Sequence, residues 1–484
     1  MISPSISITG LGVVCGAGIG HEAFWSALTT GASAIRSITR FDAGGFPCGL
    51  AAEVPPGVSA KDSVPKHYRK AVKVMARDTE LAVVAAALAV KDARLTTRMH
   101  IPEGDTHTAL TYPPDRMGCQ IGAGLIPPEV PEIVGAFASA RETNPSPELL
   151  ERTNGFSLRA WGTIAVTPGF GPVSPAAPAA DIGVGGMNNL QPLWMLKYLP
   201  NMLACHVTII HGAEGPSNTI TCSEASSLLC IGESARVIER GSADICFSGG
   251  AESKVNLMGM MRAQLLGRLA RWHQPDRSLT LSPYDPTSTG TVPGEGAAII
   301  ILERDDFAQS RGVTRYAHIV GFGAAQGAPA QIPMLKGEPT ISLGRCISSR
   351  RSGLTLAIAA ALKDAGIPAD AICAIIPQAI GVPSLDSNEL ASLREIFGPR
   401  LAEIPLITLP PFFGDCAAGA GGLQVAAAAL CLHHQMLPAR LHGGTPAPGV
   451  RAGAIASEAA ALEYILVCTG SLAGENAAVI LKRA

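Results

Sequence analysis

A thiol, a hydroxyl and a carboxylate follow one another at Cys222, Ser223 and Glu224, between two segments of different character. The run before them ends at Thr221 and is β-rich, and the residues after them follow a helical pattern that ends at Gly241. A strand that leads directly into a helix places the turn at the helix N-terminus, where free N–H groups and the helix dipole favour an anion. Enzymes use this geometry to present a nucleophile. The stretch therefore predicts a nucleophile or an acid at a helix start, depending on which residue occupies the turn.

The bulk composition indicates a large, well-packed protein of nearly balanced charge. The chain has 484 residues, of which 47% are hydrophobic, and its formal net charge is −2 at pH 7. This length exceeds what one hydrophobic core usually fills, so we expect two fused halves, residues 1–262 and residues 263–484. The small negative charge argues against a nucleic-acid partner.

The sequence also argues against membrane, metal and cofactor chemistry. No apolar run reaches the roughly 18 residues of a membrane-spanning helix, and Met1–Ser5 lacks the basic region of a secretory signal. The 12 cysteines include no CxxC pair, so we interpret them as buried thiols in a reducing compartment. Gly10-Leu11-Gly12 and Gly16-Ala17-Gly18 have the wrong spacing for a dinucleotide turn. We expect a cytoplasmic protein without a membrane span, metal or cofactor.

The second half of the chain repeats the order of elements in the first. Each half has an Ala-rich helix that ends in Lys-Asp-Ala before a strand, and a second helix before a strand that runs into a turn. The four pairs are 81–93 with 116–124, 354–365 with 372–376, 228–241 with 245–252, and 422–434 with 464–468. Residues 101–115 and 165–186 are rich in Pro, Gly and small residues and are expected to be inserted loops. The pattern predicts a duplicated, layered α/β protein.

Six short motifs stand in an order and spacing that are distinctive only together. They are Ile8-Thr9-Gly10-Leu11-Gly12-Val13-Val14, Arg40-Phe41-Asp42, Gly215-Pro216-Ser217, Ser248-Gly249-Gly250-Ala251-Glu252, Tyr284-Asp285 and Val292-Pro293-Gly294-Glu295-Gly296-Ala297. With them, nearly the whole chain resembles the β-ketoacyl synthases of the thiolase fold. The resemblance implies a duplicated five-layer α/β/α/β/α fold. It also implies a site in which a Cys nucleophile and two His residues condense acyl chains held on an acyl carrier protein.

This sequence differs from the family at every catalytic position. Counted from the motifs on both sides, the nucleophile position is Glu224, and the first His position is Gln378. The Lys and His of the second loop correspond to Pro410 and Asp415, and none of the 11 histidines lies in either loop. The family's gate near the C-terminus corresponds to Leu472. Because a carboxylate is a weak nucleophile, and acyl transfer to it would give a more reactive anhydride, ordinary condensation is not expected.

One subgroup of the family fits these replacements. The chain-length-factor subunits of type II polyketide synthases are inactive paralogues that commonly carry Gln at the Cys position and pair with an active ketosynthase. The resemblance therefore implies a non-catalytic subunit of polyketide or specialised fatty-acid biosynthesis. Its partners would be an active β-ketoacyl synthase, in a heterodimer, and an acyl carrier protein. Two alternatives stay open: a malonyl-carrier-protein decarboxylase, although such members keep the His residues, and a homodimeric scaffold that holds acyl chains.

Individual residues also have more than one interpretation. Glu224 is either a plain acid at a helix start, which Ser223 could cap, or a surrogate for the Cys that supports an interface or keeps the pocket closed. Cys222 would be a shifted nucleophile only with a two-residue deletion before it, so a buried strand cysteine is favoured. Gln378 and Asp415 either fill their loops or bind polar groups. A set of basic residues forms either a docking surface for the carrier protein or a solvated helix face: Lys66, Arg69, Lys70, Lys73 and Arg77.

Overall fold

A long mixed sheet organises the larger of two compact units in a computed structural model of the chain. The structure describes residues 5–139 apart from 103 and 106, residues 147 and 190, and residues 193–272, 280–328 and 352–484. The larger unit comprises Met1–Ile126 and Pro200–Ala484, and the smaller one is Pro127–Leu199. The expected loop at 165–186 lies outside the described residues.

The sheet of the larger unit runs in the order β6-β5-β7-β8-β1-β9-β14-β13-β10, and the short β2 pairs with β1. The bounds are β1 Ile6–Cys15, β2 Gly18–Ile19, β5 Met117–Ala123, β6 Ser217–Ile220, β7 Ile245–Ser253, β8 Glu295–Arg304, β9 Ala317–Gln326, β10 Ala374–Ile376, β13 Tyr464–Gly470 and β14 Glu475–Lys482. Strands β1 and β9 join the two sides of the sheet through only three residue pairs, from Ile6↔Ile319 to Ile8↔Ala317.

The two sides of this sheet have the same pattern of pairings. On one side β6, β5 and β7 are parallel, and β8 and β1 continue antiparallel. On the other side a parallel bridge between Ile375 and Leu406 precedes parallel β10 and β13, and β14 and β9 continue antiparallel. The duplicated α/β fold expected from the sequence is thereby confirmed. The exact division at residues 262 and 263 stays a prediction; β8, which follows it, pairs with β1 and β7.

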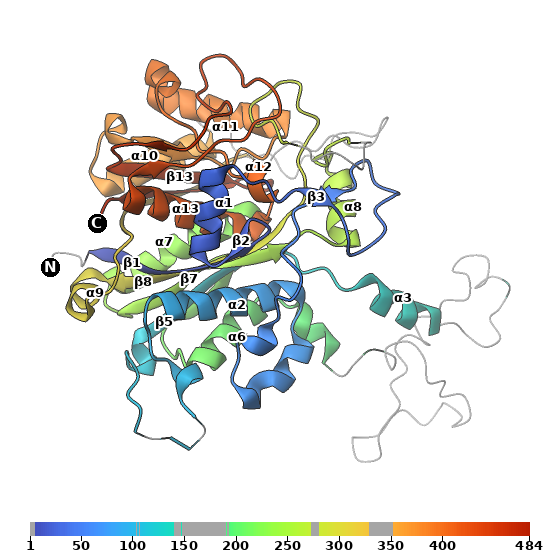
Figure 1. Cartoon of the computed structure of the whole chain (residues 1–484), viewed down its shortest axis with the longest axis vertical. Helices are drawn as coiled ribbons and strands as arrows, with labels where there is room; N and C mark the ends of the chain where they lie inside the picture. The colour runs from blue at the N-terminus through green and yellow to red at the C-terminus, as the bar shows by residue number, and fades with distance from the viewer. Residues whose placement is uncertain are drawn as a thin grey trace. The chain divides into compact units, whose positions relative to one another are not determined.

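Helices form three layers around the two sides of the sheet (Figure 1). Helix α2 (Arg77–Asp92) packs on β1 and β8, and α6 (Met202–His211) packs on β5. Helices α7 (Ser226–Glu239) and α13 (Ala420–His434) contact each other and both sides of the sheet, so they form the middle layer. Helix α10 (Gly353–Ala365) packs on β9 and β14. The arrangement is the predicted α/β/α/β/α order.

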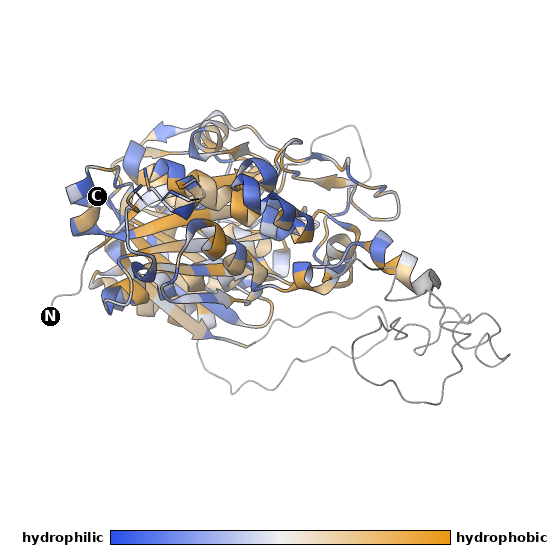
Figure 2. Ribbon diagram, turned by 90° about the horizontal axis from the view of Figure 1, so that it is seen from below, coloured by the Kyte–Doolittle hydropathy of each residue, from blue (hydrophilic) through white to orange (hydrophobic). Residues whose placement is uncertain are grey.

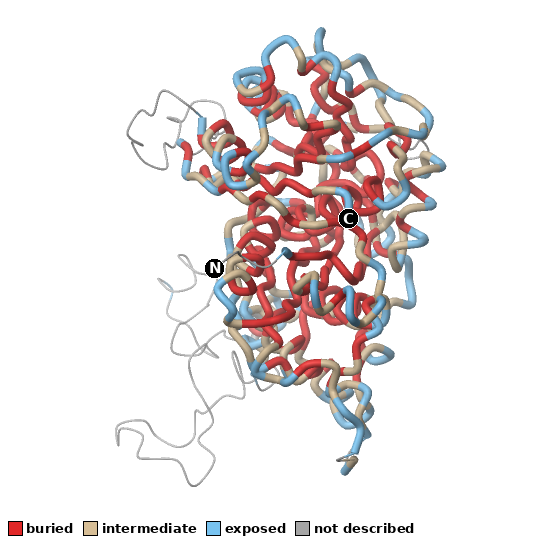
Figure 3. The backbone as a smooth tube through the Cα atoms, turned by 90° about the vertical axis from the view of Figure 1, so that its left-hand side faces the viewer, coloured by how far each residue is buried: buried red, intermediate tan, exposed pale blue. Residues whose placement is uncertain are grey.

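The middle layer explains the composition of α13. Residues 421–432 are all buried, and most of them are Ala, Gly, Leu or Val. A helix that is apolar on every side is stable only when it is buried all round, and small side chains let two sheets approach it closely. Figure 2 shows the most hydrophobic residues in the interior strands, and Figure 3 shows buried backbone through the middle of the larger unit.

The remaining elements are short or peripheral. Their bounds are α1 His21–Thr30, α8 Leu257–Leu265, α9 Asp305–Arg311, α11 Pro383–Phe397, α12 Pro410–Phe413, β3 Arg36–Ser37, β4 Leu50–Ala51, β11 Met436–Leu437 and β12 Glu458–Ala459. Among the 3₁₀ segments, η2 is Lys66–Val74, η7 is Ser223–Ala225 and η10 is Ala417–Gly419. None of the helices in the described part of the chain has the length and apolar character needed to cross a bilayer.

The smaller unit contains α3 (Val130–Ser139) and the 3₁₀ segment η6 (Trp194–Tyr198). Glu132 of α3 accepts hydrogen bonds from Lys197 Nζ at 2.5 Å and from the Tyr198 hydroxyl at 2.7 Å. These contacts hold the two helical segments of this unit together.

Candidate functional site

Two turns lead into the two helices of the middle layer. In the first, β6 ends at Ile220 and η7 leads into α7; in the second, α12 ends at Phe413 and η10 leads into α13. Each turn contains a non-glycine residue in the left-handed region, Ser223 with φ 50° and Ala417 with φ 42°. This conformation is costly for residues with a side chain and often marks a functional turn. The Ser227 hydroxyl donates a hydrogen bond to the Ala418 carbonyl and so joins the two helix starts.

Two glycines of the sheet allow the helix starts to lie directly on it. A Cβ on Gly122 of β5 would lie 2.7 Å from backbone atoms of Ser226 and Ser227. A Cβ on Gly250 of β7 would clash with the Ser227 hydroxyl and lie 2.5 Å from the Ala418 carbonyl oxygen. Only glycine permits such a close approach. Both helix N-termini therefore point at the same small region.

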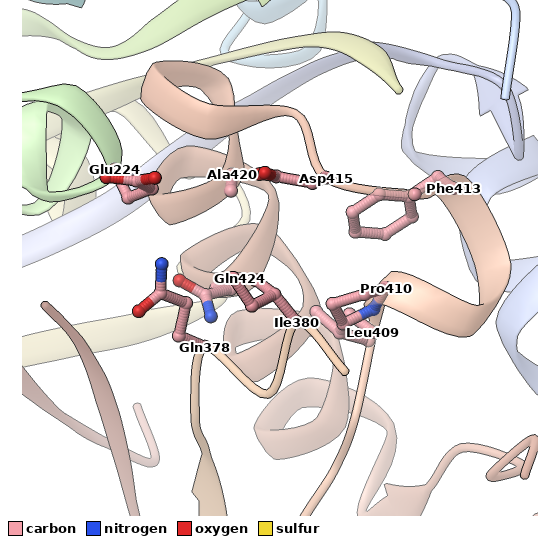
Figure 4. A pocket seen from close by; sticks show the side chains of 10 residues that line it. Glu224, Gln378, Ile380, Leu409, Pro410, Phe413, Asp415, Ala420 and Gln424 are labelled. Atoms are coloured by element: carbon pink, nitrogen blue, oxygen red, sulfur yellow. The ribbon is translucent and has the colours of Figure 1, made fainter. Parts of the chain in front are cut away.

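That region is a pocket whose lining includes all three sequence-predicted positions Glu224, Gln378 and Asp415. Figure 4 shows their polar side chains facing a common space. The rest of the lining is mainly apolar, with one further amide: Ile380, Leu409, Pro410, Phe413, Gly414, Ala420 and Gln424. The cavity has a volume of about 10 Å³, which is enough room for about one water molecule.

Glu224 is only 4% exposed and forms a buried ion pair with Arg268. Its carboxylate Oε1 accepts a hydrogen bond from Arg268 Nη1. Burial acts to raise the pKa of Glu224, but the positive charges of Arg268 and Lys254 outweigh it and lower the pKa below its ordinary value. The side chain is therefore an ionised carboxylate. Ser223 does not cap the helix; instead the Ser226 hydroxyl accepts the Cys222 N–H at 2.8 Å.

Asp415 lies in the same pocket and is also buried, but its pKa is shifted in the opposite direction to that of Glu224. Its Oδ1 accepts a hydrogen bond from the Ala417 N–H at 2.9 Å. Burial raises the pKa of Asp415, and the negative charge of Glu224 raises it further, against the opposing charges of Lys254 and Arg268. One pocket thus holds two acids whose environments shift their pKa values apart.

Sequence reasoning missed two cations beside this pocket, Lys254 and Arg268, whose charges act on Glu224 and Asp415. Lys254 follows β7, and its Nζ lies 2.7 Å from Glu252 Oε1; Glu252 Oε2 in turn accepts the Ala418 N–H at 3.0 Å. Arg268 follows α8 and is 44 residues away from Glu224 in the chain. The Gly-Gly-Ala-Glu motif gave a signal for the neighbourhood of Lys254, but no local pattern pointed to Arg268.

The two glutamines of the pocket have structural contacts. Gln378 Oε1 accepts the Gly470 N–H at 3.3 Å, and Gln424 of α13 donates from Nε2 to the Pro377 carbonyl at 2.7 Å. Among the described residues, neither Glu224 Oε2 nor Gln424 Oε1 has a hydrogen-bond partner, and both atoms are buried. The pocket therefore presents unused acceptors beside the Glu224–Arg268 pair.

Two other sequence candidates lie outside the lining of the pocket. Cys222 is half-buried, and burial together with the charge of Glu475 raises its pKa, which opposes formation of the thiolate that a nucleophile needs. Leu472 is half-buried in the turn between β13 and β14, which a hydrogen bond from the Ser471 N–H to the Glu475 carbonyl closes at 2.7 Å. A gate role for Leu472 stays a prediction.

The basic set divides into exposed and structural members. Lys66, Arg69, Lys70 and Lys73 are exposed along η2. Arg77 instead begins α2, and its Nε lies 3.1 Å from Oε2 of the buried Glu295. A docking role can therefore be considered for the four exposed residues, whereas Arg77 supports the core. In the described residues, no group of three or more His, Cys, Asp or Glu side chains could hold a metal ion.

Fold and pocket together define a thiolase-like α/β protein in which each half contributes a turn and the start of a buried helix. The N-terminal domain model of the β-ketoacyl synthases matches residues 3–124 and 178–308, and the C-terminal domain model matches residues 344–443. The chain belongs to the β-ketoacyl synthase family.

Three known proteins place the chain within this family. It is 26% identical over 481 residues to the tetracenomycin polyketide synthase ketoacyl synthase beta subunit of Streptomyces glaucescens, covering 99% of this chain and 98% of that protein. The same identity and the same coverages hold for 3-oxoacyl-[acyl-carrier-protein] synthase 2 of Staphylococcus aureus strain COL. The solved structure of the ishigamide ketosynthase/chain length factor has a similar fold, with a TM-score of 0.73, 22% identity and complete coverage of both chains.

Proposed function

We propose that this chain is a non-catalytic, chain-length-factor-like subunit that pairs with an active β-ketoacyl synthase in polyketide or specialised fatty-acid biosynthesis. The observation that carries the proposal is the state of the nucleophile position. Glu224 occupies it as an ionised carboxylate, in a buried ion pair with Arg268.

The chemistry of the pocket supports this proposal. Condensation needs a thiolate to accept the acyl group, and imidazoles to stabilise the charge that develops when carbon dioxide leaves. A carboxylate held by a guanidinium is a poor nucleophile, and its acyl product would be an anhydride. Gln378, Pro410 and Asp415 line the pocket at the His, Lys and His positions. A cavity of about 10 Å³ has room for a water molecule and excludes an acyl chain.

The proposed partners follow from the relatives. The Streptomyces glaucescens protein is by name the beta subunit of a polyketide synthase, and the Staphylococcus aureus protein is by name a synthase that acts on acyl carrier protein. By analogy we assign this chain an active ketosynthase as heterodimer partner and an acyl carrier protein as a transient partner, in the cytoplasm. The exposed residues Lys66, Arg69, Lys70 and Lys73 would suit an acidic carrier protein.

The test compares the chain alone with the chain purified together with its co-expressed ketosynthase. Each sample is incubated with malonyl-carrier and acyl-carrier protein, and covalent adducts and carbon dioxide are measured. We expect a one-to-one complex, acylation of the ketosynthase only, and no carbon dioxide release by this chain alone. An active-site Cys→Ala variant of the ketosynthase is the matched control, and it should abolish acylation of the complex.

Three results would contradict the proposal. An acyl adduct on Cys222 of the isolated chain would make it an enzyme with a shifted nucleophile. Carbon dioxide release by the chain alone would favour the decarboxylase. A homodimer that co-purifies from its host with no synthase attached would favour the acyl-binding scaffold.

A further inference from the structure

The cations beside Glu224 are positioned by backbone contacts that do not involve Glu224. The Arg268 N–H donates to the Ala263 carbonyl at 2.9 Å, and the Arg268 carbonyl accepts the Thr291 N–H at 2.7 Å. The Lys254 N–H donates to the Gly294 carbonyl at 3.0 Å. The backbone of both residues beside the pocket is therefore held independently of the Glu224 side chain.

The charges beside the pocket require an anion at the position of the Glu224 carboxylate. Lys254 already pairs with Glu252, whereas in the described part of the chain Arg268 has Glu224 as its one ion-pair partner. Arg268 is 8% exposed, and its Nε has no hydrogen-bond partner among the described residues. A buried guanidinium without a counter-ion is strongly unfavourable. The 14-residue helix α7, which starts two residues after Glu224, adds the partial positive charge of its N-terminus.

We propose that Arg268, Lys254 and the first turn of α7 form a binding site for a short monocarboxylate, which the chain fills with its own Glu224 side chain. In the native protein the site is permanently occupied, and this keeps the pocket closed to external acyl groups. The inference goes beyond the proposed function, because it holds for the chain with or without a ketosynthase partner.

The size of the side chain defines the ligand. A Glu→Ala change removes four non-hydrogen atoms, one carbon and a carboxylate group, and acetate has the same four-atom shape. Formate would leave a gap, and a bulky carboxylate such as benzoate is larger than the group that the substitution removes. Asp415 is the nearby acid that would repel an added anion, and its raised pKa limits that repulsion.

The experiment uses the full-length Glu224→Ala variant and sodium acetate as the probe. Thermal unfolding is followed at pH 7 with increasing acetate, with sodium chloride keeping the ionic strength constant. We expect a saturable rise in Tm of about 2 °C or more for Glu224→Ala, since a ligand that binds only the folded state stabilises it. Formate should raise the Tm less, and benzoate should have no effect.

Two matched variants separate this site from general salt effects. Glu224→Gln keeps the shape of the side chain, so its site stays filled and acetate should have no effect. Glu224→Ala/Arg268→Met removes the cation and should fold without responding to acetate. Wild-type protein should not respond either.

The proposal is overturned if folded Glu224→Ala ignores acetate, or if wild type and Glu224→Gln respond as strongly as Glu224→Ala. If Glu224→Ala unfolds in chloride, recovery of the fold in acetate supports the proposal, and failure to recover contradicts it. Failure of the double variant to fold also contradicts it, because removal of both charges should remove the need for an anion.

Discussion

The two helix starts of the middle layer share a backbone and differ in their chemistry. Ser223 before α7 and Ala417 before α13 adopt the same left-handed conformation, and both turns lie on Gly250. Glu224 at the first turn has a cationic partner, Arg268, whereas Asp415 at the second accepts a backbone N–H and has no ion-pair partner among the described residues. The pKa of Glu224 is lowered, and that of Asp415 is raised. Because both acids lie near helix N-termini, the ion pair with Arg268 and not the helix dipole accounts for the opposite directions of the two pKa shifts.

This difference bears on the proposed replacement of the nucleophile by Glu224. The position that Glu224 occupies is not open, because its ion pair with Arg268 fills it. Two cations lie beside the pocket, and each faces one acid: Lys254 pairs with Glu252, and Arg268 pairs with Glu224. The pKa of Asp415 is raised by burial and by the negative charge of Glu224.

The largest effect should come from breaking the ion pair on one side. Arg268→Met leaves Glu224 buried without its partner, and we expect a loss of about 3–5 kcal/mol in the free energy of unfolding, measured by urea denaturation. The double variant Glu224→Gln/Arg268→Met should lose much less, since no buried charge is left alone. Equal losses in the single and double variants would show that the pair is not coupled.

A smaller effect should follow from separating the two helix starts from the sheet. Gly250→Ala places a Cβ against the Ser227 hydroxyl and 2.5 Å from the Ala418 carbonyl oxygen, so both starts must shift. We expect a loss of about 1–3 kcal/mol in the free energy of unfolding. Gly45→Ala, where nothing lies within 4 Å of the added Cβ, is the control and should stay close to wild type. A wild-type stability for Gly250→Ala would contradict the close approach.

The opposite pKa shifts should give opposite pH dependences. Asp415 has a folded pKa above its ordinary 3.8, so its stabilising contribution is present below pH 3.8 and is lost as the pH rises through the folded pKa. Asp415→Asn does not titrate, and its unfolding free energy relative to wild type should therefore increase between pH 4 and pH 8. The difference in unfolding free energy between Asp415→Asn and wild type should change by at most about 1.4 kcal/mol per pH unit, as measured by denaturant unfolding at each pH.

Glu224 should behave in the reverse sense. Its folded pKa lies below the ordinary 4.5, so its contribution is present above pH 4.5 and is lost as the pH falls through the folded pKa. The advantage of wild type over Glu224→Gln should thus shrink as the pH decreases from 5.5 to 3.5, as measured by denaturant unfolding at each pH. If the unfolding free energies of Glu224→Gln and Asp415→Asn, each relative to wild type, changed in the same direction with pH, the opposite pKa shifts of the two acids would be contradicted.

The smallest effect concerns the feature that the two turns share. Ser223→Gly and Ala417→Gly each replace a side chain in the left-handed region by the residue that adopts it without strain. We expect each change to be neutral or to raise the free energy of unfolding by up to about 1 kcal/mol. A large loss at only one turn would show that the two backbones are not equivalent.

Sequence patterns predicted the fold well where the signal is local or periodic. The apolar stretch 422–434 indicated a buried helix, and the structure extends it to Ala420–His434. The repeated order of helices and strands predicted the duplication that the sheet confirms. Counting between motifs placed Glu224, Gln378 and Asp415 at equivalent positions, and these residues line one pocket. Ser223 as a helix cap was wrong, because the turn places it in the left-handed region and no side-chain hydrogen bond caps the start of η7 or α7.

By itself the sequence determined which residue types stand at the positions predicted from motif spacing, because that spacing is a property of the chain alone. Only the tertiary structure decided their charge. Arg268 comes from another segment to pair with Glu224, and Arg77 of the basic set pairs with the buried Glu295. In the part of the chain that the structure describes, Asp415 has a backbone hydrogen bond and no ion pair. The protonation of a buried acid depends on its solvation and on charges that folding brings within a few ångströms. Neither quantity is encoded in the local sequence around the acid.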